Sequence, residues 1–188
     1  MNFFQAIILG IVQALTEYLP VSSSAHIRII GDLMLGADPG AAFTAIIQIG
    51  TELAVILYFR RDIINILSHW FGCLFGKNGP DWRARMGRGD KYATLGWNVI
   101  VGSIPIIILG FTLQNIIETS LRNLWITVTV LFLFGLLLWI VDARSRQIKT
   151  MDDMNYRDAF LFGLGQLMAL IPGVSRSGGT ITVGRALG

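Results

Sequence analysis

Three long apolar stretches constrain the fold of this chain more than any other feature of its sequence. They are residues 43–59, 93–113 and 124–141. A helix that crosses a bilayer needs about 17–25 such residues, so each stretch is long enough to span. Only 14% of the residues are charged, against about 25% in soluble domains. We therefore predict an all-α, polytopic membrane helical bundle, and disorder is excluded because 53% of the residues are hydrophobic.

Basic residues between these stretches predict the orientation of the chain. Residues 60–92 hold seven Lys or Arg and residues 142–158 hold four, whereas residues 114–123 hold only Arg122. The positive-inside rule places the first two segments in the cytoplasm and residues 27–42 outside, as a loop. The net charge of +3 is explained in this way, without a nucleic-acid partner. Residues 63–75 fit either an interfacial helix or an extension of the first span.

Two shorter apolar stretches, residues 3–21 and 160–174, each break at a proline and run into small polar residues. This pattern predicts two re-entrant helix hairpins, the first over residues 1–26, because broken backbone persists at membrane depth only when protein or water surrounds it. The hairpins share a Gly-x-x-Gln pattern and enter from opposite sides, which indicates inverted-topology repeats. Chance similarity is the alternative, since Gly, Pro and Ser are common. We expect one integral membrane domain over residues 1–188, with a first repeat over 1–150, the start of a second over 159–188, and the remainder of that repeat missing.

The first hairpin carries polar side chains in an apolar setting. Gln13 and Glu17 are four residues apart and share a helical face. An intramembrane acid costs about 2.5–3.5 kcal/mol, so Glu17 is either a structural hydrogen-bonding group, a general base or a ligand of a hard divalent cation. Ser22 and Ser23 follow in the turn. His26 comes next, and its ordinary pKa suits proton transfer at neutral pH.

The second hairpin carries Arg176 between Ser175 and Ser177, with Thr180 and three glycines close by. An arginine among apolar residues needs an anion, and guanidinium matches phosphate. The alternative is a structural ion pair between Arg176 and Glu17 or another acid. Glu52, inside the first span, is a further candidate that could equally bond Gln48 one turn away. Arg28 and Asp32, also four apart, are expected to form a surface pair.

Two separated motifs resemble a known family. The first motif resembles the first signature of bacterial undecaprenyl-diphosphatases of the bacitracin-resistance type, and it reads Gln13-Ala-Leu-Thr-Glu-Tyr-Leu-Pro-Val-Ser-Ser-Ser-Ala-His26. The second motif resembles the second signature of that family, and it reads Pro172-Gly-Val-Ser-Arg-Ser-Gly-Gly-Thr180. The resemblance implies a multi-pass protein of the bacterial plasma membrane, with a site open to the outer face. It also implies hydrolysis of undecaprenyl diphosphate to the monophosphate carrier used in peptidoglycan synthesis, supported by Mg or Ca.

The resemblance also implies roles for individual residues. Glu17, Ser23, His26 and Arg176 would be catalytic, with Glu17 also a metal ligand. The expected substrate-binding residues are Gln13, Ser22, Ser175, Ser177 and Thr180. Either Ser23 or a metal-activated water could be the nucleophile. Expected partners are the lipid substrate, the bilayer and a second copy in a homodimer. The alternative function is a lipid-phosphate transporter using the same anion site, because inverted repeats with broken helices also build transporters.

Overall fold

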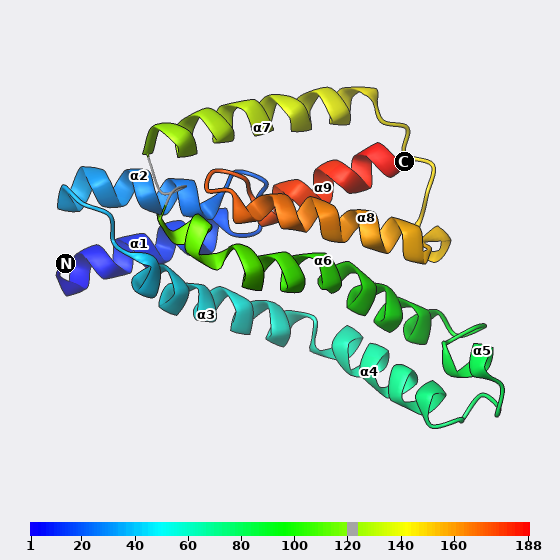
Figure 1. Ribbon diagram of the computed structural model, residues 1–188. Coiled ribbons are helices and arrows are strands. Elements are labelled where there is room, and N and C mark those ends of the chain that lie inside the picture. Colours follow the sequence, from blue (N-terminus) through cyan, green and yellow to red (C-terminus); the bar gives the residue numbers. More distant parts are fainter. Residues whose placement is uncertain (120–123) are drawn as a thin grey trace.

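The computed structural model describes residues 1–119 and 124–188, with side chains up to residue 112 and from residue 124 onward (Figure 1). All regular structure in these residues is helical, so the all-α prediction is confirmed. The helices are α1 (Phe3–Thr16), α2 (Ser23–Leu35), α3 (Ala41–Tyr58), α4 (Arg60–Leu74), α5 (Trp82–Arg85), α6 (Lys91–Thr119), α7 (Leu124–Arg144), α8 (Tyr156–Leu167) and α9 (Arg176–Leu187). Two 3₁₀ turns, Met151–Asp153 and Met168–Leu170, precede and follow α8. The sequence predicted a loop over residues 114–123 between the second and third spans. Residues 114–119 instead belong to α6, so the prediction is wrong for them, and residues 120–123, including Arg122, lie outside the described residues.

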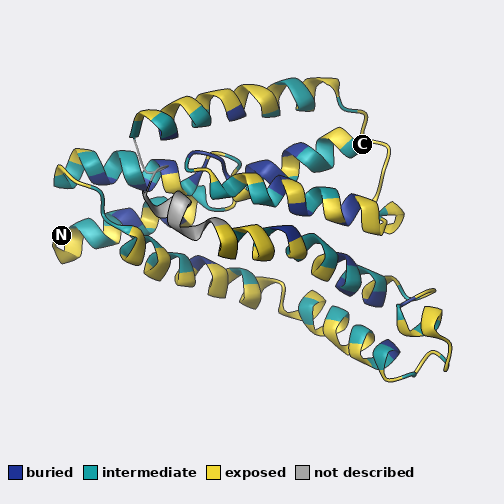
Figure 2. Ribbon diagram, in the orientation of Figure 1, coloured by how far each residue is buried: buried dark blue, intermediate teal, exposed yellow. Residues whose placement is uncertain are grey.

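Three helices are long and apolar enough to cross a membrane: α3, residues Lys91–Thr112 of α6, and α7. They confirm the three spans predicted from the sequence. Their large apolar side chains are mostly exposed, as in Leu57, Ile107 and Phe132 (Figure 2). Such surfaces are disfavoured in water, whereas in lipid they need no protein cover. The chain is therefore a membrane-integral protein.

Helices α1 and α2 form one helical hairpin, and α8 and α9 form another. The two hairpins approach from opposite ends of the molecule, and their turns meet near its centre (Figure 1). Helix α2 runs to Leu35, so the prediction that residues 27–42 form a loop is wrong for most of that segment. No proline interrupts residues 23–35, and α2 ends where Gly36 adopts a left-handed conformation, with φ +67°.

Glycines let the second hairpin pack closely within the bundle. A Cβ added to Gly165 of α8 would lie 2.7 Å from the carbonyl oxygen of Gly179 in α9, and one on Gly179 would collide with the carbonyl of Gly165. A Cβ on Gly163 would likewise collide with the carbonyl of Gly102 in α6. Small residues at such contacts are typical of helix packing in membranes. The position of the second turn therefore depends on close backbone contacts made by α8.

Helix α4 contains most of residues 63–75, for which the sequence allowed either an interfacial helix or an extension of the first span. It is a helix separate from α3, because the backbone bends at Phe59 (φ −90°, ψ 15°). It packs on the start of α6, where the rings of Trp70 and Trp97 lie 5.3 Å apart. Asp90 caps α6 by accepting from the Ala93 N–H at 3.1 Å, and it also bonds Nδ1 of His69 at 2.8 Å. Burial alone would raise the pKa of Asp90, but these hydrogen bonds outweigh it and hold the pKa below its ordinary value.

Candidate functional site

The first turn gathers two hydrogen-bond donors around one carboxylate oxygen. Gln13 Nε2 donates to Glu17 Oε2 at 2.8 Å, as their shared helical face predicts. Ser23 Oγ, six residues along the chain, donates to the same oxygen at 2.5 Å. The hydroxyl of Ser23 is therefore already in contact with the group that could accept its proton.

Ser22 produces this contact by turning the chain sharply between α1 and α2. Its φ is +64°, a left-handed conformation that is rare for residues other than glycine. The residue is only 1% exposed, and its hydroxyl lies 3.2 Å from that of Ser24. A strained backbone held in a buried turn is typical of functional sites, where the surrounding structure offsets its cost.

The second turn presents Arg176 at the start of α9. Gly173, with φ +104°, allows the turn, and Ser175 caps the helix by accepting from the N–H of Gly178 at 3.1 Å. The hydroxyls of Ser175 and Ser177 lie 2.9 Å apart. Arg176 is the first residue of a twelve-residue helix, so the helix dipole adds to its positive potential.

The two turns dock against each other. Ser177 Oγ donates to the carbonyl oxygen of Leu19 at 2.9 Å, and Ser175 Oγ donates to the same oxygen at 3.5 Å. A cavity of about 110 Å³ lies at this junction. Its lining comes from both turns and from α3: Gln13, Glu17, Ser22, Ser23, Ser24, Thr44, Gln48, Ala169, Val174, Ser175 and Arg176.

Arg176 forms its ion pair with Glu52 rather than with Glu17. Its Nη1 atom lies 3.3 Å from Glu52 Oε1, which also accepts from Gln48 Nε2 at 3.2 Å. Both charged side chains are about half exposed, at 47% and 51%. Of the two roles that the sequence allowed for Glu52, the structure therefore shows the bond with Gln48 and adds a contact with the site arginine.

Three predicted site residues lie outside the set that lines this cavity: His26, Ser177 and Thr180. Nδ1 of His26 bonds the carbonyl oxygen of Ser22 at 2.9 Å, one turn back along α2. The hydroxyl of Thr180 donates to the carbonyl oxygens of Arg176 and Ser177 within α9. Sequence reasoning, in turn, missed Thr44 as a lining residue and treated Gln48 only as a partner of Glu52. The four-residue spacing of Thr44, Gln48 and Glu52 on one face of α3 could have indicated both.

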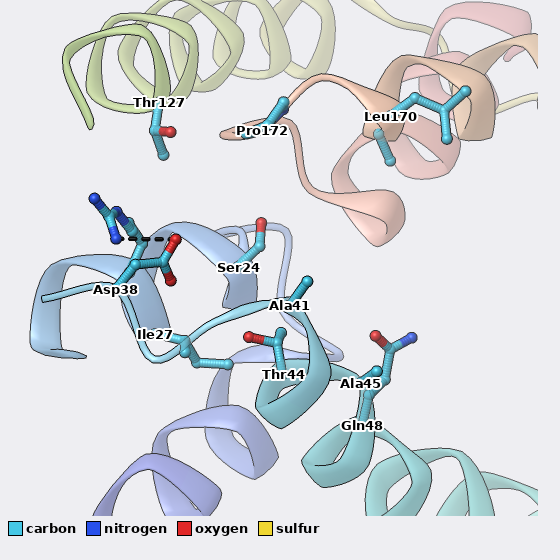
Figure 3. Close-up of a pocket in the computed structure, with 12 residues that line it drawn as sticks. Ser24, Ile27, Asp38, Ala41, Thr44, Ala45, Gln48, Thr127, Leu170 and Pro172 are labelled. Carbon is cyan, nitrogen blue, oxygen red and sulfur yellow. Dashed lines mark ion pairs between the residues drawn. The ribbon is translucent and has the colours of Figure 1, made fainter. Parts of the chain in front are cut away.

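A second cavity, of about 330 Å³, adjoins the first and shares Ser24, Thr44, Gln48 and Ala169 with it (Figure 3). Its other walls are mostly apolar, and come from Ile27, Ala41, Ala45, Leu170 and Pro172. At one end Arg28 pairs with Asp38 at 3.0 Å, so the predicted pairing of Arg28 with Asp32 is wrong. Asp38 reaches Arg28 because the chain folds back beyond Gly36, a turn that helical spacing does not predict.

Comparison with known proteins agrees with the motifs at this site. Residues 6–188 match the family described as bacitracin resistance protein BacA. The chain belongs to that family. It is 89% identical to an undecaprenyl-diphosphatase of Bifidobacterium longum subsp. infantis and 71% identical to one of Bifidobacterium adolescentis, in each case over the whole chain and 64% of the relative. It is 53% identical to an undecaprenyl-diphosphatase of Micrococcus luteus, over 65% of that protein.

The BacA-family chain thus spans about 64% of the length of its Bifidobacterium relatives. The three relatives are named as diphosphatases and none as a transporter, so the transporter interpretation has no support from these comparisons. The two motifs that carry the resemblance are the two turns that meet at the cavity.

The donor set of this BacA-family site fits a hard divalent cation, provided that phosphate oxygens complete the coordination. Buried Gln13 Oε1 has no hydrogen-bond partner in the described part of the chain, and the nitrogen of the same amide donates to the Glu17 carboxylate. Carboxylate, amide and hydroxyl oxygens are the ligands that Mg²⁺ and Ca²⁺ prefer. The described residues hold no group of three His, Cys, Asp or Glu suited to a metal. That donor set matches a Mg²⁺ bound by one carboxylate and substrate phosphates rather than a closed protein cage.

Proposed function

We propose that this protein hydrolyses undecaprenyl diphosphate to undecaprenyl phosphate and phosphate. The observation that most supports this proposal is that residues of both turns line one cavity. Ser23, which is hydrogen-bonded to Glu17, comes from the first turn, and Arg176 comes from the second. Family membership and the names of the relatives support the substrate. The product is the lipid carrier of peptidoglycan synthesis, and its recycling would confer resistance to bacitracin.

The reaction divides between the two turns. Arg176 and the N-terminus of α9 bind the diphosphate and stabilise the charge that develops on its phosphoryl oxygens. The hydroxyl of Ser23 attacks the terminal phosphorus while Glu17 accepts its proton, and the bridging oxygen leaves with the lipid phosphate. Water then releases phosphate from Ser23. In the one-step alternative, a water activated by Glu17 attacks in place of Ser23.

A divalent cation, Mg or Ca, completes the proposed site. If both acids are counted as ionised, the site holds two negative charges, on Glu17 and Glu52, and one positive charge, on Arg176. A polyvalent anion would therefore enter a site that is already negative. Glu17 and Gln13 would hold the cation, which when bound supplies charge neutralisation on the phosphoryl oxygens. His26 would act from outside the cavity lining, as a proton-transfer group that reaches the site only through rearrangement.

The adjoining cavity would hold the part of the lipid tail next to the diphosphate. It opens from the diphosphate site, and its walls of Ile27, Ala41 and Leu170 suit an isoprenoid chain. The remainder of the tail would lie along the exposed apolar faces of the spans, in lipid.

The arrangement of the helices supports a membrane topology for this reaction. We place α1–α2 and α8–α9 as re-entrant hairpins of two inverted repeats, because their turns meet from opposite ends of the bundle (Figure 1). The membrane is the bacterial inner membrane, with the site open to its outer face. A homodimer and the absence of a nucleic-acid partner stay predictions from the sequence.

Phosphate release from undecaprenyl diphosphate in detergent with Mg tests this function on the full-length protein. Arg176→Ala should lower kcat/KM by about 100-fold or more, since one donor to a transition-state oxyanion contributes about 10²–10³. Arg157→Ala, which removes an exposed arginine of α8, is the matched control and should leave release unchanged. Equal release by Arg176→Ala and wild type would contradict the anion site, and no release by wild type would contradict the diphosphatase.

A further inference from the structure

The site contains two copies of one short pattern. Gln13-Ala-Leu-Thr-Glu17 at the end of α1 and Gln48-Ile-Gly-Thr-Glu52 in α3 both read Gln-x-x-Thr-Glu. In each copy the glutamine Nε2 donates to the carboxylate one turn further on, at 2.8 Å and 3.2 Å respectively. The second copy thus repeats the local geometry of the first.

A hydrogen bond joins the residue that follows the first copy to the second copy. The hydroxyl of Tyr18, next to Glu17, donates to the carbonyl oxygen of Thr51, next to Glu52. Both glutamines line the same cavity. The carboxylates differ in their other partner, because Glu17 takes the hydroxyl of Ser23 and Glu52 takes the guanidinium of Arg176. The first copy therefore faces the nucleophile, and the second faces the anion-binding group.

The contact between Glu52 and Arg176 opposes anion binding. Glu52 already supplies the negative charge that an arginine at this depth needs. A diphosphate on the same guanidinium either displaces this carboxylate or lies close to it. Like charges close to each other repel, so the second arrangement is unfavourable.

We propose that Glu52 is an exchangeable counter-ion of Arg176, a positioning residue that holds the guanidinium at the cavity and yields it to the diphosphate. The inference rests on the proposed function for the identity of the anion. A terminal diphosphate carries more charge than phosphate and competes better with Glu52. The carboxylate therefore discriminates in favour of the substrate, and it returns to Arg176 as the released phosphate leaves.

Binding of inorganic diphosphate, measured by calorimetry on the full-length protein in detergent with Mg, tests this inference. Glu52→Gln keeps the shape of the side chain and removes its charge, so diphosphate should bind about two- to fivefold tighter, the range expected for a half-exposed ion pair. Glu52→Asp, which keeps the charge, should bind like wild type. Asp152→Asn is the matched control, because it removes the carboxylate of the exposed pair with Lys91, outside the site, and should change nothing.

Unchanged or weaker binding by Glu52→Gln would overturn the inference, as would a wild-type protein that does not bind diphosphate. A merely structural ion pair predicts a lower unfolding temperature without tighter binding. In the turnover assay, Glu52→Gln should lower the KM for undecaprenyl diphosphate and strengthen inhibition by phosphate. A wild-type protein that binds diphosphate but releases no phosphate would refute the proposed function, while the binding comparison still decides the role of Glu52.

Discussion

At the scale of single residues, helical periodicity predicted only part of the site. The contact between Gln13 and Glu17 follows from their spacing, and the sequence identified Arg176 as a residue that needs an anion. The contact between Ser23 and Glu17 depends on the left-handed backbone at Ser22, which no spacing indicates. The pairing of Arg176 with Glu52 joins residues 124 positions apart, so it depends on tertiary packing.

Substitutions at Glu17 and Ser23 separate the two possible nucleophiles. Glu17→Gln should lower phosphate release by about 100-fold or more in either route, because it removes the proton acceptor. Ser23→Ala should abolish turnover if Ser23 attacks phosphorus. Near-normal turnover of Ser23→Ala would instead favour the activated water. Ser68→Ala, an exposed serine of α4 bonded to its own helix, is the control and should behave like wild type.

At the scale of elements, the sequence predicted the spans and the breaks between helices better than the ends of the helices. Composition and length identified α3, α6 and α7, because a membrane demands long apolar segments. The extent of α2 was missed, since residues 27–42 were assigned to the loop before the first span although no proline interrupts residues 23–35. The close packing of α8 was also missed, because glycines in a sequence do not show which backbone they approach.

The glycine contact between α8 and α9 gives a prediction at this scale. Gly179→Ala should destabilise the protein by about 1–3 kcal/mol, because the added methyl group meets the carbonyl of Gly165. Gly10→Ala in α1 is the matched control. It has nothing within 4 Å of the new Cβ, so it should be neutral or stabilising by up to about 1 kcal/mol.

Thermal unfolding in detergent, followed by circular dichroism, measures both variants. Equal unfolding temperatures for Gly179→Ala and Gly10→Ala would mean that α8 and α9 do not approach each other as closely as described.

At the scale of the whole molecule, the distribution of basic residues predicts the orientation in the membrane. A single-cysteine series tests it, starting from Cys73→Ser, which removes the one cysteine of residues 1–188. Ala37→Cys, between α2 and α3, should react with a membrane-impermeant maleimide on intact cells. Lys77→Cys, between α4 and α5, should react only after the membrane is opened, because the positive-inside rule places its basic segment in the cytoplasm. The reverse labelling pattern would mean that the orientation in the membrane is the opposite of the predicted one.

The docking of the two turns also sets an order for biosynthesis. Ser175 meets Leu19 across 156 residues of chain, so the ribosome makes the first half of the site well before the second. At about 5–20 residues per second, the interval is roughly eight to thirty seconds. During that time the Glu17 carboxylate has Gln13 and Ser23 as partners, and both are close in sequence. The nascent first hairpin can therefore satisfy its own acid with local hydrogen bonds before the second hairpin is made.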